Sequence, residues 1–179
     1  VDKNKIQSND KNIEKTINDM LEVCPNALPE DCKKLKNALK VIKNMSSNYI
    51  YNQLSPSDKK IMLFTALLKD CDKTPKKSAF NAFYILQKFD LCREDRDKAY
   101  LLIRNQDWLK RVNEAEKYSE EIKSIAFDLH YSNLFEMQKL LAESDLSSKY
   151  NLFKNEKEIG YLVEELKNSQ PLLPVTAFP

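Results

Sequence analysis

Hydrophobic residues recur every three or four positions along most of this chain, and this spacing places them on one face of an α-helix. The first segment shows the pattern clearly, with Ile13, Ile17 and Met20 at helical intervals. No stretch of useful length alternates between apolar and polar residues as a half-buried strand does. We therefore predict an all-α, compact bundle of about six to eight helices, over residues 10–23, 29–49, 55–71, 75–89, 93–103, 108–129, 134–142 and 156–167.

Residues that cap helices stand at several of the predicted helix starts. Ser55 and Thr74 each precede a proline, as in an N-cap followed by proline in the first helical turn. The polar cluster at residues 46–48 predicts a break in the long second helix, and a turn is expected near residues 131–132. These signals divide the chain without glycine, since Gly160 is its single glycine.

The shortage of glycine also excludes several kinds of chemistry. Phosphate-binding loops, dinucleotide fingerprints and nucleophile elbows need glycines that let the backbone turn sharply or approach a ligand closely. Tight β-hairpins also use glycine at their turns, so the shortage agrees with an all-α fold. We expect none of these motifs in the protein.

The segment 75–89 carries the densest group of aromatic residues. Phe80, Phe83 and Tyr84 fall on one side of the predicted helix, and alanine and aliphatic residues occupy much of the rest. We therefore expect this helix to be the central, most buried element, with its aromatic side chains in a packed core. The alternative is a pocket for a small apolar ligand, lined by Phe80, Phe83, Tyr84 and Trp108.

The length and the charge of the chain limit the domain organisation and the kinds of partner that we expect. The chain has 179 residues, of which 42% are hydrophobic, so we expect one helical domain over residues 1–168. Its 29 basic and 27 acidic residues give a net charge of +2, so we expect no nucleic-acid partner. Lysine pairs such as Lys76–Lys77 can form a local basic patch, although acidic neighbours favour ordinary solvated helix faces. No run of 18 apolar residues occurs, so no membrane insertion is expected.

The four cysteines, Cys24, Cys32, Cys71 and Cys92, are an even number and lack the paired spacings of a zinc site. Three of them stand at predicted helix ends beside charged residues, so we expect two disulfides. The alternative is buried thiols in a reduced protein. In a simple up-and-down bundle, a helix about 24 Å long separates Cys71 from Cys92. A bridge needs Cα atoms within about 7 Å, so this pairing conflicts with that arrangement, and the pairing stays open.

Two further features bear on the compartment. Asn44-Met45-Ser46 is a glycosylation sequon, of a kind that also arises often by chance, and it makes Asn44 a candidate glycosylation site of a secreted protein. The charged start, residues 1–5, lacks the apolar stretch of a signal peptide. Both a mature chain whose signal has been removed and a cytosolic fragment would begin in this way.

The last segment, residues 169–179, differs in kind from the rest of the chain. It has three prolines and no charged side chain, so we expect an extended tail. We expect Leu172, Leu173, Val175 and Phe178 to dock on the bundle of their own chain. The alternative is a tail that binds a partner.

Nothing in the sequence marks a catalytic centre. His130 is the only histidine, and it stands near a predicted helix end, where a histidine commonly binds terminal carbonyls or solvent. The carboxylates fall in charged runs typical of exposed helix faces, and no cysteine stands in a nucleophile motif. We therefore expect a protein that is not an enzyme and uses no cofactor or metal.

Cys32, Tyr51 and Cys71 form a Cys-Tyr-Cys series. In this feature the chain resembles the bicycle family of aphid salivary effectors, within the wider group of small secreted helical proteins that arthropods and parasites deliver into a host. That family has two such series, and a second is obtained here only by using Cys71 again, with Tyr84 and Cys92. The resemblance implies secretion in saliva into plant tissue and an effector role without known catalysis.

These observations together predict a secreted, extracellular helical effector that binds a host macromolecule, most simply a host protein. Two alternatives stay open. One is an intracellular helical adaptor or regulatory domain with reduced thiols, and the other is a carrier of small apolar ligands inside the bundle. The sequence makes no prediction of the oligomeric state.

Overall fold

The computed structural model describes residues 11–24, 32–115, 119–145 and 156–169. Every regular element among these residues is helical, which confirms the all-α prediction. The helices are α1 (Lys11–Val23), α2 (Cys32–Ser46), α3 (Tyr49–Gln53), α4 (Pro56–Leu68), α5 (Pro75–Leu86), α6 (Arg93–Arg104), α7 (Trp108–Glu114), α8 (Glu120–His130), α9 (Phe135–Ser144) and α10 (Glu156–Asn168), with a 3-10 turn, η2, at Tyr131–Asn133. The expected tail docking lies outside the described residues.

The helix count exceeds the predicted six to eight because a short helix, α3, follows the predicted break and because one expected helix is divided in two. The predicted break at residues 46–48 is present, and the Asn48 side chain accepts a hydrogen bond from the Ile50 backbone N–H at 2.9 Å. The segment 108–129, expected to be continuous, is instead divided into α7 and α8, and Ser119 caps α8. A serine that satisfies a free N–H at a helix start makes such a restart favourable.

The predicted caps at the two proline-containing starts are also confirmed. The Ser55 hydroxyl accepts from the Asp58 N–H, and the Thr74 hydroxyl accepts from the Lys77 N–H, each at 3.2 Å. Because each proline lies in the first turn, its missing N–H leaves no donor unsatisfied. These local signals fix where α4 and α5 begin.

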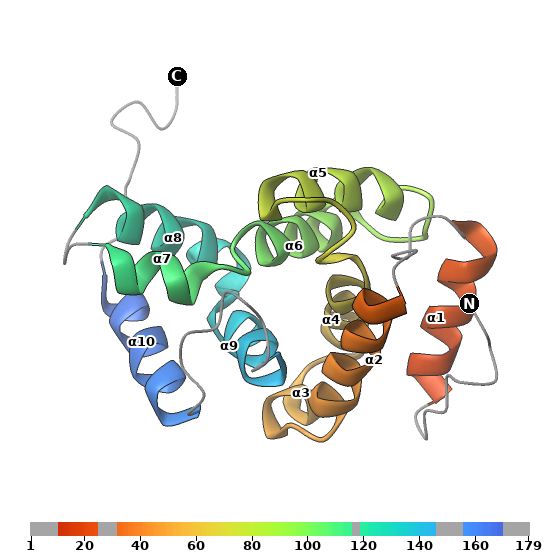
Figure 1. Ribbon diagram of the computed structural model, residues 1–179, viewed down its shortest axis with the longest axis horizontal. Helices are drawn as coiled ribbons and strands as arrows, with labels where there is room; N and C mark the ends of the chain where they lie inside the picture. Colours follow the sequence, from red (N-terminus) through yellow and green to blue (C-terminus); the bar gives the residue numbers. More distant parts are fainter. Residues whose placement is uncertain (1–10, 25–31, 116–118, 146–155, 170–179) are drawn as a thin grey trace.

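The centre of the fold is α4, and the expectation that the helix over 75–89 is the central element is wrong. Helix α4 contacts α1, α2, α5, α6 and α9, and all residues from 61 to 68 are buried. Helix α5 instead lies on the outside, along α6 (Figure 1). Its buried residues are Ser78, Ala79, Ala82 and Leu86. Small inward residues let α5 lie close against its neighbour, and they leave the aromatic residues on other faces.

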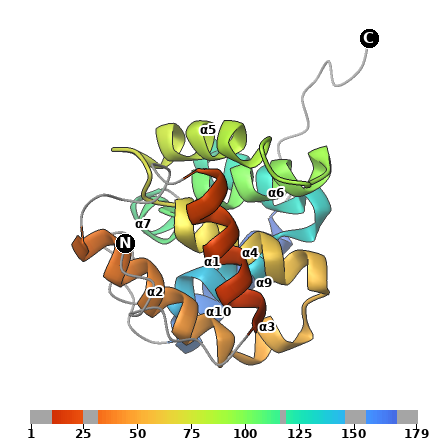
Figure 2. The ribbon, with the colours of Figure 1, turned by 90° about the vertical axis from the view of Figure 1, so that its right-hand side faces the viewer.

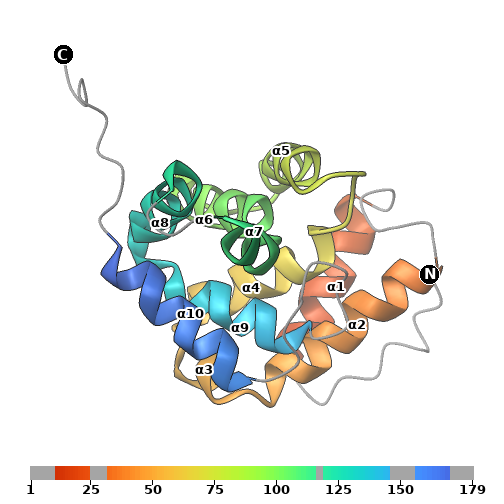
Figure 3. The ribbon, with the colours of Figure 1, turned by 60° about the vertical axis from the view of Figure 1, so that its left-hand side comes forward.

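Residues of all ten described helices enter one hydrophobic core. Helix α9 is a second hub of this core, because it contacts α2, α3, α4, α8 and α10. Helix α1 crosses in front of α4 when the molecule is viewed from its right-hand side (Figure 2). Helices α5, α6 and α8 lie along the same upper side of the molecule in two views (Figures 1 and 3). That shared side therefore combines surface residues from three separate parts of the chain.

The prediction of two disulfides is not supported, because Cys24, Cys71 and Cys92 all have free thiols. Two bridges would need all four cysteines of the chain. Helix α5, with 12 residues and a length of about 18 Å, stands between Cys71 and Cys92. The Cys71 thiol instead donates a hydrogen bond to the Ser78 carbonyl at 3.4 Å. The fold thus holds these two cysteines at opposite ends of one helix.

Candidate functional site

The aromatic residues of α5 form an exposed cluster. Phe80 and Tyr84 are 57% and 53% exposed, so the expectation that they are packed in the core is wrong. Their ring centroids lie 5.0 Å apart, and Phe83 lies 5.9 Å from Tyr84 and 6.2 Å from Tyr100 of α6. The Arg96 guanidinium also covers the Phe83 ring at 5.6 Å. Edge-to-face contacts of this kind favour the observed arrangement of the rings.

A groove of about 470 Å³ runs beside this cluster, between α6 and the end of α8. We call it the α6–α8 groove, and it is lined by Asp97, Tyr100, Leu101, Phe127, Asp128, His130 and Tyr131. Phe127 and Tyr131 are each 43% exposed. The volume lies in the range of about 300–1,000 Å³ that proteins use to hold ligands. Rings and Leu101 give this groove a largely apolar wall.

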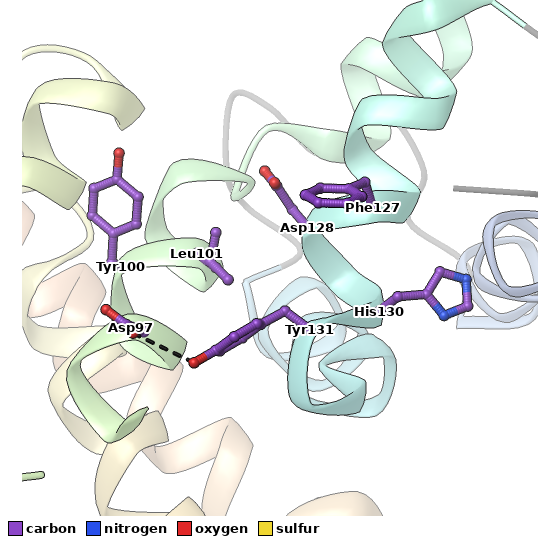
Figure 4. A pocket seen from close by; sticks show the side chains of 7 residues that line it. All are labelled: Asp97, Tyr100, Leu101, Phe127, Asp128, His130 and Tyr131. Carbon is purple, nitrogen blue, oxygen red and sulfur yellow. Dashed lines mark hydrogen bonds between the residues drawn. The ribbon is translucent and has the colours of Figure 1, made fainter. Parts of the chain in front are cut away.

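The turn after α8 positions Tyr131 across the groove. Ser132 and Asn133 have positive φ angles of 51° and 54°, so the chain reverses without a glycine, where a turn was predicted. Figure 4 shows Tyr131 reaching from this turn toward α6, where its hydroxyl donates to Asp97 at 3.4 Å. The Ser132 hydroxyl donates to Glu94 at 3.1 Å, which makes a second link to α6. The two contacts hold the end of α8 against the start of α6.

The electrostatic character of the α6–α8 groove is acidic. Asp97 and Asp128 line it, and in the part of the chain that the structure describes neither forms an ion pair. Desolvation of the phenol and the neighbouring Asp97 and Glu94 carboxylates raise the pKa of Tyr131. Tyr131 therefore stays protonated and donates its hydroxyl proton to Asp97.

A fully buried asparagine, Asn105, forms a hydrogen bond with Asp128. The Asn105 amide donates to Asp128 at 3.0 Å and to the Leu101 carbonyl at 2.9 Å, while its oxygen accepts from Arg111 at 3.1 Å. Arg111 in turn pairs with Glu121 of α8. This network holds α6, α7 and α8 in a fixed relation behind the groove. It also fixes the place of the Asp128 carboxylate.

A second groove, of about 400 Å³, lies on the other side of Tyr100, between α5 and α6. We call it the α5–α6 groove, and it is lined by Asp72, Lys76, Lys77, Phe80, Asn81, Tyr100 and Arg104. Three of these side chains are cations and one is a carboxylate, which accepts a hydrogen bond from Asn81. The local basic patch that the lysine pairs can form is thus centred on Lys76 and Lys77, completed by Arg104. Its charge is opposite to that of the α6–α8 groove.

Tyr100 lines both grooves and joins them into one surface. We call this surface the aromatic face, and it consists of Phe80, Phe83, Tyr84, Tyr100, Phe127 and Tyr131. Carboxylates flank it at the α8 end, and basic side chains flank it at the α5 end. It can therefore bind an extended partner that has apolar groups and charges of both signs.

The structure separates Trp108 from the other three residues of the predicted apolar-ligand region. Phe80, Phe83 and Tyr84 are together on α5, whereas Trp108 is only 1% exposed and begins α7 in the core. Trp108 lines neither groove. Trp108 therefore does not join the three α5 side chains at either of these grooves.

His130 and Asn44 occupy positions with ordinary structural contacts. His130 is exposed at the last residue of α8, as expected from its place in the sequence, and its ring packs edge-on against Phe135 at 4.8 Å. Figure 4 shows the His130 ring directed away from Asp97 and Tyr131. Asn44 lies within α2 and donates from its side-chain amide to the Ser144 carbonyl at 3.1 Å. A glycan on Asn44 would disturb this bond to the end of α9.

Comparisons with protein families, with curated proteins and with solved structures found no match. Among the described residues, no cluster of three or more His, Cys, Asp or Glu side chains is arranged to hold a metal ion. In the same residues, no helix combines the length and the apolar character needed to cross a bilayer. The geometry of the aromatic face is therefore the basis of the functional argument.

The sequence alone singled out half of the aromatic face. Tyr100, Phe127 and Tyr131 were missed, yet a signal was present for two of them. Phe127 and Tyr131 are four residues apart and lie outside the apolar stripe of Ile125, Ala126 and Leu129. Aromatic residues repeated at helical spacing beside a complete core stripe indicate a second apolar surface.

Proposed function

We propose that this protein is a non-enzymatic binding protein that engages another macromolecule through the aromatic face. The observation that carries the proposal is the exposure of this face, with Phe80 and Tyr84 more than half exposed. Phe127 and Tyr131 extend the exposed aromatic surface across α6 to α8. Contiguous apolar surface rimmed by polar side chains is typical of protein–protein interaction sites.

The composition of the face and the contacts among its side chains support this function. Tyrosine, phenylalanine and arginine are enriched in protein interfaces, and a few buried aromatic anchors supply most of the binding energy there. The rings at Phe83 and Tyr100 already contact each other at 6.2 Å, and Tyr131 is tied to Asp97. Side chains held in place before binding lose less conformational entropy when a partner covers them. These contacts therefore preorganise the aromatic face for binding a partner.

The Cys-Tyr-Cys resemblance implies an effector that acts in a host, and in that case the partner is a host protein. We propose secretion into a host as the location of the protein and an effector role as its biological role. The aromatic face supports binding in any compartment, because its argument depends only on exposure and shape. The setting and the binding function therefore need separate tests.

Proximity labelling tests the binding function. The protein is fused to a biotin ligase and expressed in the cells that produce or receive it, and labelled proteins are quantified by mass spectrometry. We expect a double variant, Tyr84→Lys with Phe127→Lys, to lose a subset of labelled proteins. Tyr161→Lys on α10 is the matched control, because Tyr161 is 66% exposed and lines neither groove. Equal labelling by the double variant and the control would contradict the proposal.

An intracellular adaptor is the second candidate, and the free thiols favour it. Cys71 is partly buried and hydrogen-bonded to the Ser78 carbonyl, and Cys24 is buried, as in proteins of reducing compartments. Intact mass after thiol alkylation, with and without reduction, on protein from its native source separates the two settings. Four blocked cysteines support the secreted effector. Four alkylated cysteines in the unreduced sample support the adaptor and contradict secretion in an oxidised form.

A further inference from the structure

The α6–α8 groove combines an apolar wall with two carboxylates, and this combination defines the chemistry of its occupant. Tyr100, Leu101 and Phe127 provide the apolar wall, and Asp97 and Asp128 stand beside it. We propose that this groove binds a segment of a partner protein in which an apolar side chain is next to an arginine or lysine. The inference rests on the proposed function, because it names the part of the partner that the aromatic face recognises.

Charge complementarity is the first argument for a basic occupant. In the described residues, none of the cations forms an ion pair with Asp97 or Asp128, so both carboxylates are available to a positive group. Asp97 accepts a hydrogen bond from Tyr131 and Asp128 accepts one from Asn105, which leaves further lone pairs on each. A guanidinium or ammonium group can satisfy those lone pairs with charge-assisted hydrogen bonds.

The rings supply a second argument that favours a cation over a neutral polar group. Phe127 and Tyr131 are partly exposed aromatic rings on the same groove as the carboxylates. The face of an aromatic ring attracts a cation within about 6 Å of its centroid. The protein already shows this contact on the same side of the molecule, where Arg96 covers Phe83 at 5.6 Å. The aliphatic stem of an arginine or lysine also packs well against Leu101 and the rings.

The neighbouring α5–α6 groove excludes the same kind of segment. Lys76, Lys77 and Arg104 line it against one carboxylate, Asp72, so it repels a basic segment. The whole protein has a net charge of +2, which also gives no general attraction for a basic peptide. Binding of a basic segment must therefore come from the local charge of the α6–α8 groove.

Fluorescence anisotropy with three synthetic peptides tests the proposal. The peptides are labelled amphipathic helices that share the same leucines and carry arginine, glutamine or glutamate at the polar positions. We expect the arginine peptide to bind more tightly than the glutamine peptide and the glutamate peptide to bind least. Added salt should reduce the difference, because half-exposed charges are screened. Equal affinity of the arginine and glutamine peptides would overturn the proposal.

Two pairs of variants locate the binding in the groove. Asp97→Asn should weaken binding of the arginine peptide about two- to fivefold, as for a half-exposed ion pair, and leave the glutamine peptide unchanged. Asp95→Asn makes the same charge change on α6 but lines neither groove, so it should have no effect. Phe127→Ala should weaken binding of the arginine and the glutamine peptide alike, by about fivefold or more, and Tyr161→Ala should not. Equal losses in Asp97→Asn and Asp95→Asn would show a non-specific charge effect and overturn the proposal.

Other occupants give different results. Self-association in sedimentation experiments that Phe127→Ala abolishes, without peptide binding, would make the groove an interface between copies of this chain and overturn the proposal. Loss of labelled partners in the double variant, without any preference for the arginine peptide, would retain the proposed function and reject this inference. Absence of both effects would reject both.

Discussion

The ammonium of Lys69 lies 2.9 Å from the carboxylate of Asp145, and the two side chains are only 4% and 7% exposed. Lys69 follows α4 and Asp145 follows α9, so the pair joins the ends of the two hubs of the core. Asp70 adds a second carboxylate at 2.7 Å. The Gln106 side chain donates to the Lys69 carbonyl, also at 2.7 Å, which ties the segment between α6 and α7 to the same point.

Replacing Lys69 should strongly destabilise the protein. Lys69→Met removes the buried ammonium that pairs with the Asp145 and Asp70 carboxylates, and breaking a buried ion pair in this way costs about 3–5 kcal/mol. Chemical denaturation measures the free energy of unfolding. Lys60→Met on the exposed side of α4 is the control and should stay within about 0.5 kcal/mol of the parent protein. Similar values for the two variants would mean that the buried pair does not hold the helices together.

The same pair should make stability fall at alkaline pH. Burial lowers the pKa of Lys69, but the Asp145 and Asp70 carboxylates outweigh it and raise this pKa above its ordinary value. The unfolded chain then releases the proton first, at a lysine pKa of about 10.4. The stabilisation is therefore fully present below that pH and is lost as pH rises through the higher pKa of the folded state. Thermal melts from pH 8 to 11 should show a steeper alkaline fall for the parent protein than for Lys69→Met.

Gly160→Ala should stabilise the protein. Gly160 lies inside α10 and has no positive φ angle, so its backbone does not require glycine. A Cβ at this position would meet only the end of the Lys139 side chain, at 3.8 Å, which is ordinary contact. Glycine inside a helix costs about 0.5–1 kcal/mol relative to alanine, and we expect that gain in the free energy of unfolding. A lower melting temperature for the variant would contradict this placement of Gly160.

Truncation of two phenylalanines should change the stability by very different amounts. Phe64 in α4 is 1% exposed and packs against Phe89 at 4.9 Å, so Phe64→Ala should cost about 3–5 kcal/mol. Phe80 in α5 is 57% exposed, so Phe80→Ala should change the free energy of unfolding by less than about 0.5 kcal/mol. Urea unfolding of the two variants compares them directly. A large loss in the free energy of unfolding for Phe80→Ala would show that the aromatic cluster is packed in the core.

The cysteines should differ in reactivity. Burial and the nearby Asp72 carboxylate raise the pKa of the Cys71 thiol to about 11, whereas Cys92 is exposed at the start of α6. Since the thiolate is the reactive form, iodoacetamide at pH 8 should modify Cys71 more than about tenfold more slowly than Cys92. Peptide mapping by mass spectrometry after timed quenching gives the two rates. Failure of Cys92 to react before reduction would show that it is held in a disulfide.

Part of the candidate site was predictable, because its residues carry local signals. Phe80, Phe83 and Tyr84 were recognised as an aromatic group from their spacing on one helix. Their exposure was not predictable, because the periodic pattern of this helix is compatible with either face turned inward. The structure buries Ala79, Ala82 and Leu86 instead. Which face of α5 is buried depends on α6, which packs closely against small side chains. The sequence of the α5 segment alone does not contain this information.

The sequence by itself determined the helical class, several helix ends and the turn after α8. Helical spacing, the Ser55 and Thr74 caps and the break before Tyr49 are interactions within a few residues, and a local pattern therefore contains them. Tertiary structure alone decided that α4 is central, that Cys71 and Cys92 stand apart, and that Asp97 meets Tyr131 across 34 positions. Each of these depends on which helix faces pack together, and that packing is set by the burial of the whole chain at once.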